Sequence, residues 1–321
     1  MKAVVRTVYG SPEVLSLEEV ERPVPRPDEV LIRVRATSLN ASDWEMLRGK
    51  PLYGRMTGLF RPGIKILGSD VAGTVEEVGS GAVGFAPGDE VYGDIFERWG
   101  GFAQWVCAPV SMLRPKPGSM SFEQAAALPQ SGVIALQGLA DRGRLQPGQS
   151  VLINGAGGGG GTFAIQIAKL LGAEVTAVDN EQKLALMAEL GADHVVDFAQ
   201  QDVTQNRARY DLILDLVGHH RLSDFRRSLA PGGRYLLVGG SMGLLLNTLF
   251  AGSLVSLLSR RKMGILALQV NQGLDVLEEH FASGAVVPVI DRCYPLAETP
   301  AALRRLGEGR ALGKLIITME R

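Results

Sequence analysis

The segment VLINGAGGGGGTFAIQIAKLLGAEVTAVDN, residues 151–180, constrains the fold of this chain more than any other. It has the pattern of a buried strand, a glycine-rich turn, a helix, and a second strand that ends in an acid. Glycine lets the backbone turn tightly and approach a ligand closely, and the unpaired N–H groups that begin the next helix attract an anion. The pattern predicts a βαβ unit of a parallel sheet, with a dinucleotide pyrophosphate bound at the turn.

The glycines leave the register of this motif open. Gly155, Gly157 and Gly160 fit the spacing G-x-G-x-x-G, while Gly158 and Gly161 fit a shifted register. A glycine-rich hinge in an unrelated fold is the alternative, but the flanking strand and helix favour a dinucleotide site. The candidate pyrophosphate-binding residues are Gly155, Gly157, Gly158, Gly160, Gly161 and Thr162, which opens the expected helix.

Asp179 ends the second strand, where an acid can accept hydrogen bonds from the adenosine ribose and repel a 2′-phosphate. We therefore expect NAD(P)H as cofactor, with a weak preference for NADH. The preference is weak because Asn180 and Lys183 follow closely and could hold a phosphate. Asp179 could also cap the next helix, and the two roles are compatible.

The chain as a whole predicts an α/β fold with two lobes. Residues 1–125 contain short β-type runs closed by Gly and Pro, which indicate a β barrel. From about residue 128, strands alternate with helices, as in a doubly wound parallel sheet. We expect a barrel lobe of residues 1–125 and 270–321 and a dinucleotide-binding lobe of residues 126–269. The six strands expected in that second lobe are Ser150–Asn154, Glu174–Asp179, His194–Phe198, Tyr210–Leu216, Arg234–Gly239 and Met263–Leu268.

Composition and charge exclude several classes of function. The 33 basic and 34 acidic residues give a net charge of -1, so the overall field would not attract nucleic acid. Two cysteines cannot form a four-thiolate metal site. The opening residues MKAVVRTVYG lack the long apolar run of a signal peptide. We expect a reduced, cytoplasmic setting.

The most apolar stretch runs from Met242 to Leu258. It is shorter than a spanning helix needs and contains four polar residues, which argues against membrane contact. Arg260, Arg261 and Lys262 follow it and leave an interfacial helix as an alternative. We favour a subunit interface or a flap over the substrate.

Five segments together carry a family resemblance: ILGSDVAGTVEEVGSG, PGDEVYGD, LINGAGGGGGTFAIQIAKLLGAEV, DLILDLVG and LAPGGRYLLVGG. With them the chain resembles the medium-chain dehydrogenase/reductase superfamily. Within it, the chain is similar to the zinc-independent quinone oxidoreductase branch, especially the reticulon-interacting mitochondrial oxidoreductases and bacterial relatives often labelled NAD(P)-dependent alcohol dehydrogenases. The resemblance implies a GroES-like catalytic lobe, a Rossmann lobe and a homodimer.

The positions that match zinc ligands in this superfamily carry other residues here. Zinc-dependent members have a Cys after an early strand, a Gly-His-Glu where residues 68–70 are Gly-Ser-Asp, and a later Cys. In their place stand Asn40, Ser69, and Gln130 or Ser131. Nothing soft or imidazole-like remains to hold zinc, so we expect no metal.

Without a Lewis acid a saturated alcohol is hard to oxidise, whereas a quinone or an α,β-unsaturated carbonyl can accept hydride when donors face its oxygen. The candidate catalytic residues are Tyr53, Asn40 and Asp43. By resemblance Tyr53 matches a tyrosine that lines the cleft of quinone reductases, although it could be a surface aromatic. Asn40 is placed to touch nicotinamide. Asp43, like Asp70, could instead be structural and accept backbone hydrogen bonds at a turn.

The resemblance also assigns cofactor contacts at the ends of later strands. Small residues there let the nicotinamide ring lie close to the backbone, although tight turns would need them too. A lysine in ALGKLIITM matches a position near the cofactor phosphates, and a solvated lysine is the alternative. These candidates are Leu216, Val217, Gly239, Gly240, Ser241 and Lys314.

The expected function is that of a zinc-independent, NAD(P)H-dependent oxidoreductase that transfers hydride to a small quinone or enone. Two alternatives remain open. An enoyl-thioester reductase would need a basic rim for a coenzyme phosphate, which the sequence does not reveal. A non-catalytic redox sensor would bind the dinucleotide without turnover.

Overall fold

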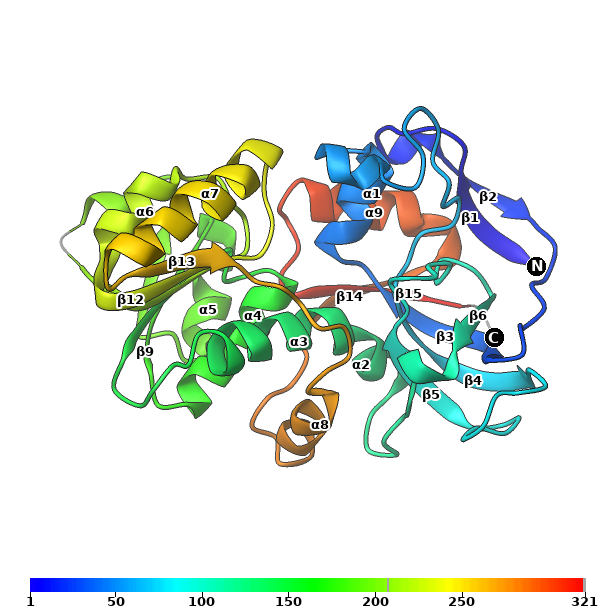
Figure 1. Cartoon of the computed structure of the whole chain (residues 1–321). Coiled ribbons are helices and arrows are strands. Elements are labelled where there is room, and N and C mark those ends of the chain that lie inside the picture. Colours follow the sequence, from blue (N-terminus) through cyan, green and yellow to red (C-terminus); the bar gives the residue numbers. More distant parts are fainter. Residues whose placement is uncertain (207, 320–321) are drawn as a thin grey trace. The chain divides into compact units, whose positions relative to one another are not determined.

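The computed structural model describes residues 1–206 and 208–319. The chain divides into two compact units (Figure 1). The first unit comprises Met1–Gln130, Val270–Leu274 and Ile290–Arg321, and the second comprises Ser131–Gln269 and Asp275–Val289. This division gives residues 275–289 to the second unit, whereas the sequence placed the whole tail with the first.

The first unit is built on β-strands, as expected. Its strands are β1 (Lys2–Arg6), β2 (Leu15–Glu19), β3 (Glu29–Ser38), β4 (Asp70–Val78), β5 (Glu90–Asp94), β6 (Trp105–Pro109), β7 (Arg114–Pro115), β14 (Ile290–Pro295) and β15 (Lys314–Thr318). Its helices are α1 (Ala41–Arg48), α2 (Phe122–Ala127) and α9 (Thr299–Gly307).

Seven of these strands form one sheet in the order β14-β15-β3-β4-β5-β7, with β6 also paired to β3. The pairs are antiparallel except β14 and β15, which run parallel. Alternate residues of β3 and β4, among them Val30, Ile32, Val34, Val71 and Val75, are buried in one core cluster. β3 ends at Ser38 and β4 begins at Asp70, and the antiparallel pairing of the two strands places these residues opposite each other.

The second unit contains the predicted parallel sheet. Its strands are β8 (Ser150–Asn154), β9 (Glu174–Asp179), β10 (His194–Asp197), β11 (Tyr210–Asp215), β12 (Leu229–Leu237) and β13 (Lys262–Ile265). Its helices are α3 (Pro129–Leu136), which begins at the boundary, α4 (Gly159–Leu170), α5 (Leu184–Glu189), α6 (Leu222–Ser228), α7 (Met242–Leu258) and α8 (Leu274–Ala282).

All six strands are parallel, in the order β10-β9-β8-β11-β12-β13. The order reverses direction between β8 and β11, so α4 and α5 cover one face and α6 and α7 the other (Figure 1). Dinucleotides bind outside the carboxyl ends of strands at such a reversal. The bounds of β8 and β9 are as predicted, whereas β10 and β11 each end one residue earlier and β13 covers Lys262–Ile265 instead of Met263–Leu268. The largest difference is in β12, which covers Leu229–Leu237 instead of Arg234–Gly239, because Leu229 pairs with Tyr210 ahead of an irregularity in the register.

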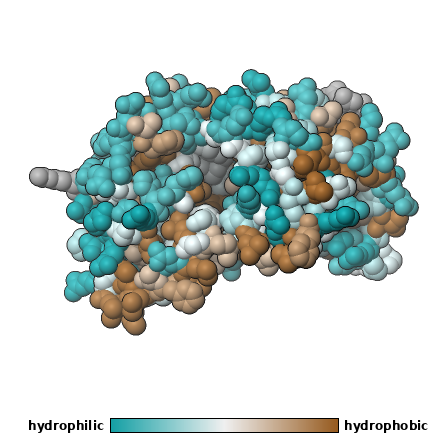
Figure 2. All heavy atoms as spheres, turned by 90° about the horizontal axis from the view of Figure 1, so that it is seen from above, coloured by the Kyte–Doolittle hydropathy of each residue, from teal (hydrophilic) through white to brown (hydrophobic). Residues whose placement is uncertain are grey.

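Helix α7 is apolar on both sides. Leu244, Thr248 and Gly252 face the interior, whereas Leu246, Leu249, Phe250, Leu254, Leu257 and Leu258 are exposed. Apolar side chains also gather in separate places on the face seen in Figure 2, among hydrophilic neighbours. Among the described residues, no helix combines the length and apolar character needed to cross a membrane.

Candidate active site

The turn after β8 is held by glycines that no other residue could replace without movement. Gly155 has a φ of +88°, and an added Cβ there would lie 2.5 Å from Val217 Cγ2. A Cβ on Gly157 would lie 2.6 Å from the Lys183 side chain, and one on Gly161 would lie 2.3 Å from the Gly155 carbonyl oxygen. Gly161 therefore allows α4 to pack directly against the turn, while Gly155 and Gly157 allow the turn to approach Val217 and Lys183.

Gly158 and Gly160 differ from these three, because a Cβ added at either position would make no contact shorter than an ordinary van der Waals distance. An added Cβ on Gly158 would meet only the Gly155 oxygen, at 3.6 Å, and one on Gly160 would meet Leu216 at 3.7 Å. Gly158 is the N-cap of the 12-residue α4, whose first N–H groups have no partner within the helix. A pyrophosphate fits this cradle, because the open glycine backbone and the helix N-terminus lie together.

The structure gives Asp179 two partners that the sequence did not reveal. Asp179 Oδ2 accepts a hydrogen bond from the Gly157 N–H at 3.0 Å, so the acid at the end of β9 fixes the glycine turn. Asp179 Oδ1 lies 3.1 Å from Lys183 Nζ, and both side chains are buried. Asp179 and Lys183 therefore form one buried ion pair beside the turn.

The other predicted cofactor residues of this unit lie close to the same turn. A Cβ on Gly155 would touch Leu216 and Val217, and one on Gly218 would lie 2.4 Å from the Gly239 oxygen and 3.0 Å from Gly240 Cα. Thr162 is buried and its hydroxyl donates to the Gly159 carbonyl. Ser241 caps α7 and lines a hollow of about 370 Å³ with Gly218. The strand ends thus bring these candidates to one edge of the sheet.

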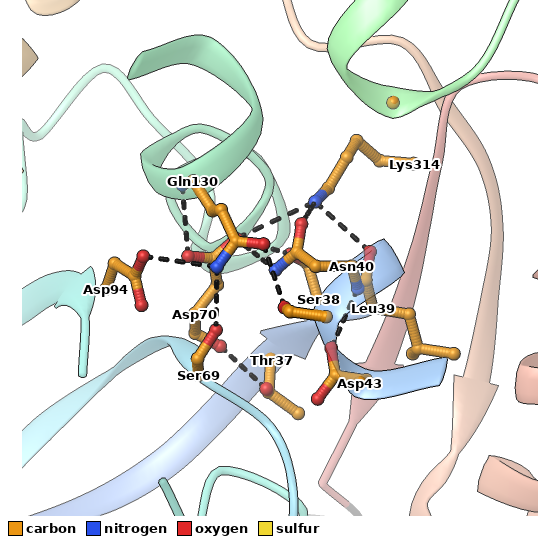
Figure 3. A network of polar contacts seen from close by, with 12 residues as sticks. Thr37, Ser38, Leu39, Asn40, Asp43, Ser69, Asp70, Asp94, Gln130 and Lys314 are labelled. Atoms are coloured by element: carbon orange, nitrogen blue, oxygen red, sulfur yellow. Dashed lines mark hydrogen bonds and ion pairs between the residues drawn. The ribbon is translucent and has the colours of Figure 1, made fainter. Parts of the chain in front are cut away.

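In the first unit, the positions that match zinc ligands meet in a network of hydrogen bonds (Figure 3). Asn40 Nδ2 donates to Asp70 Oδ2 at 2.9 Å, and the Gln130 N–H donates to Asp70 Oδ1 at 3.1 Å. Gln130 Nε2 also donates to Ser69 Oγ and to Asp94 Oδ2, each at 3.3 Å. Asp70 therefore links Asn40 with Gln130, and the Gln130 side chain bonds directly to Ser69.

Lys314 completes this network from the start of β15. Its ammonium donates to Asn40 Oδ1 at 2.6 Å and to the Leu39 carbonyl at 3.2 Å, and it lies 3.6 Å from Asp70 Oδ2. Lys314 and Asp70 are 1% and 0% exposed. Burial raises the pKa of Asp70 and lowers the pKa of Lys314, and in each case the charge of the other group opposes the shift.

Two further carboxyls are buried here: Asp43, beside the network, and Asp94, which accepts from Gln130 within it. Asp43 accepts backbone hydrogen bonds from Asn40 at 2.8 Å and Gly68 at 2.9 Å, and burial raises its pKa to about 7. Burial, with the charge of Asp70, raises the pKa of Asp94 to about 7. Among the described residues, no group of three or more His, Cys, Asp or Glu side chains is arranged to hold a metal ion.

Tyr53 lies in a 3-10 turn, Leu52–Arg55, of the first unit and is half-buried. Its hydroxyl is hydrogen-bonded to the carboxyl of Glu45 on α1. Burial raises the pKa of Tyr53, and the hydrogen bond and negative charge of Glu45 raise it further. The phenol is therefore kept protonated, with its O–H as a donor.

Sequence reasoning missed several members of these clusters. Asp94 and Ser38 bond to Gln130 and Asp70, and neither was a candidate. The strand-ending position of Asp94 in PGDEVYGD was a usable signal, because residues that end strands gather at one edge of a sheet. Glu45 had no comparable signal, since an acid on a surface helix is common.

Comparisons with known proteins agree with this architecture. Residues 26–118 match the family model of the alcohol dehydrogenase GroES-like domain, and residues 190–317 match that of zinc-binding dehydrogenases. The chain is 33% identical over 331 residues to the 2-methylene-furan-3-one reductase of Solanum lycopersicum, with 99% of this chain and 79% of that protein covered. It is 32% identical over 359 residues to the mitochondrial NAD(P)H oxidoreductase RTN4IP1 of Bos taurus, with 99% and 89% covered.

Solved structures give the same result. The quinone oxidoreductase from Coxiella burnetii superposes with a TM-score of 0.89 at 29% identity, over 100% of this chain and 99% of that one. The expected GroES-like and Rossmann-type units are thereby confirmed. This chain belongs to the medium-chain dehydrogenase/reductase superfamily, in the branch that includes the quinone oxidoreductases.

Proposed function

We propose that this chain is an NAD(P)H-dependent oxidoreductase that transfers hydride to a quinone or an α,β-unsaturated carbonyl. The observation that carries the proposal is the turn at Gly158 and Gly160, where open backbone meets the N-terminus of α4. The names of the similar proteins support the acceptor class, because a methylene-furanone is an enone and a quinone also contains carbonyls conjugated with carbon–carbon double bonds. The bound dinucleotide would supply the hydride.

The reaction is proposed to proceed without zinc. Asn40, Ser69 and Gln130 offer only amide and hydroxyl groups, which zinc binds poorly compared with thiolate and imidazole. These groups also satisfy one another through Asp70 and Lys314. Activity that survives a strong chelator, with no zinc in the purified protein, supports this proposal.

Three residues are proposed to assist the acceptor. Tyr53 is the candidate donor to the developing oxyanion, since its protonated hydroxyl already donates to Glu45 and can be shared with a carbonyl oxygen. Asn40 is held by Lys314 and Asp70 in a fixed orientation. Asp43 is a positioning residue, because both of its oxygens accept backbone N–H groups at the start of α1 and at Gly68.

The cofactor preference is proposed to lean towards NADH. Lys183 is paired with Asp179 at 3.1 Å and is buried, so its charge is not free to hold a 2′-phosphate. The same pair would place a carboxylate close to that phosphate. The ammonium of Lys314, which was expected near the cofactor phosphates, is instead bonded to Asn40 and Leu39.

The setting is proposed to be a reducing cytoplasm and the protein a homodimer. Both cysteines, Cys107 and Cys293, are free thiols. The exposed Leu246, Leu249, Phe250 and Leu254 of α7 support an association between copies, because a helix that is apolar on all sides normally has both sides covered.

The test measures turnover of a panel of quinones, enones and enoyl thioesters with NADH or NADPH. Turnover is monitored as the loss of the reduced-nicotinamide absorbance. A Tyr53→Phe variant should lower kcat/KM by roughly 100-fold, as loss of one oxyanion donor does elsewhere. Trp44→Phe, on the same helix as Glu45, is the matched control for local packing. Tight cofactor binding with no turnover of any acceptor would favour the redox sensor, and preferential turnover of thioesters would favour the enoyl-thioester reductase.

A further inference from the structure

A second hollow in the Rossmann-type unit is lined almost entirely by arginine. Its volume is about 440 Å³, and its lining residues are Arg209, Ser223, Arg226, Arg227 and Arg261. Three separate segments supply the arginines: the residues just before β11, the residues just before β13, and the end of α6.

The hollow lies away from the dinucleotide turn. Arg209 directly precedes β11, and Arg261 directly precedes β13. Arg226 and Arg227 occupy the last turn of α6, which leads into the start of β12. The arginines therefore gather at the amino ends of three parallel strands, whereas dinucleotides bind at the carboxyl ends. The hollow therefore lies apart from the proposed dinucleotide site.

Four guanidinium groups here have only one carboxylate partner within the described chain. Arg227 pairs with Asp224 at 2.7 Å. Arg209 donates to the Ala208 carbonyl and Arg261 to the Leu229 carbonyl, and neither contact neutralises a charge. Arg226 is exposed and has no ion pair among the described residues. Since a guanidinium keeps its charge at any physiological pH, the hollow is a concentrated positive site.

The shape of the donors indicates which anion fits. Each guanidinium presents a planar fork that matches two oxygens of a phosphate, and several forks from different directions suit a group with several charged oxygens. The Ser223 hydroxyl lines the same wall and donates to Asp224 Oδ1 at 3.3 Å, so the arginines are the donors that face the hollow. An anion would also relieve the mutual repulsion of the arginines.

We propose that this hollow binds a phosphate-bearing anion. The phosphate can belong to a soluble compound or to an anionic lipid headgroup, and both present the same oxygens. The exposed Leu257 and Leu258, which end α7 shortly before Arg261, lie 81% and 75% open to solvent and suit the lipid source. The experiment separates the two.

The first arm titrates the protein with pyrophosphate by calorimetry, with and without saturating NADH to block the glycine turn. The wild type should bind pyrophosphate in the presence of NADH, and Arg226→Gln should bind it roughly tenfold more weakly, as expected when one charged hydrogen-bond donor is lost. Arg260→Gln is the matched control, because Arg260 is exposed, carries the same charge and does not line the hollow. Equal affinities for all three proteins, or no binding by the wild type, overturn the soluble-phosphate source.

The second arm sediments the protein with phosphatidylcholine vesicles, with and without phosphatidic acid. Co-sedimentation that requires phosphatidic acid and is lost in Arg226→Gln supports the lipid source. Binding of pyrophosphate without co-sedimentation supports the soluble source. If Arg226→Gln and Arg260→Gln match the wild type in both arms, the hollow is not an anion site. Oxidoreductase turnover, measured in parallel, shows independently whether the proposed function holds.

Discussion

Replacing Asp179 with serine should convert the proposed weak preference for NADH into a preference for NADPH. In the folded protein Asp179 Oδ1 lies 3.1 Å from Lys183 Nζ, and their side chains are only 8% and 7% exposed. The variant leaves the ammonium buried without its carboxylate. Removal of one partner of a buried pair lowers stability by about 3–5 kcal/mol. A ligand that restores a negative charge beside Lys183 should recover part of this loss.

The 2′-phosphate of NADPH is the group that would supply that charge. A hydrogen bond to a charged group contributes about 1.5–3 kcal/mol. Because about 1.4 kcal/mol corresponds to a factor of ten, the ratio of the two dissociation constants should move roughly 10- to 100-fold towards NADPH. Asp179 also accepts from the Gly157 N–H, so both cofactors should bind more weakly, but this effect cancels in the ratio.

The assay is a fluorescence titration of each protein with NADH and NADPH, accompanied by thermal melts. The matched control is Lys183→Met in the Asp179→Ser background, which should return the ratio to near its original value. An unchanged ratio in Asp179→Ser would refute the reasoning. A gain for NADPH that persists without Lys183 would also refute it, because some other cation would then be binding the phosphate.

Other consequences of the structure can be measured on single variants. Lys314→Met should lower the free energy of unfolding in urea by about 3–5 kcal/mol, and Asp70→Asn added to it should restore part of the loss. Gly161→Ala should lower stability by about 1–3 kcal/mol, because its Cβ would overlap backbone, whereas Gly158→Ala should leave stability nearly unchanged and weaken cofactor binding. Burial raises the pKa of Asp94 from 3.8 to about 7. The folded state therefore keeps a proton that the unfolded state has lost, so the stability that Asp94 contributes should fall as pH rises from about 4 to about 7, and urea midpoints of Asp94→Asn should fall less.

The parallel sheet was predictable because its signal is local. Each strand of the second unit is a short apolar run, and all six expected strands are present. The start of β12 was missed because Pro231 and the two glycines after it have the composition of a turn, while the pairing of Leu229 with Tyr210 depends on a strand elsewhere in the chain. The local sequence therefore does not predict a strand boundary that such pairing sets.

The network of the first unit was less predictable, because its contacts also join residues that lie far apart in the sequence. Lys314 and Asn40 are hydrogen-bonded although they lie 274 residues apart in the sequence. Family resemblance indicated that Asn40, Ser69 and Gln130 occupy matching positions, but it did not show that Asp70 links Asn40 with Gln130. The sequence does not distinguish a buried lysine at the start of a strand from a solvated one, because its carboxylate partner comes close only in the folded chain.

The run of glycines at the turn explains why its register could not be chosen from the sequence. A sequence pattern counts every glycine alike, but the structure separates two reasons for having one. Gly155, Gly157 and Gly161 are required by neighbouring protein atoms, and their spacing is G-x-G-x-x-x-G. Gly158 and Gly160 face no such neighbour, so the close approach of a ligand to the backbone can account for glycine there. The two positions that the fold does not need are therefore the strongest indication that a pyrophosphate binds at this turn.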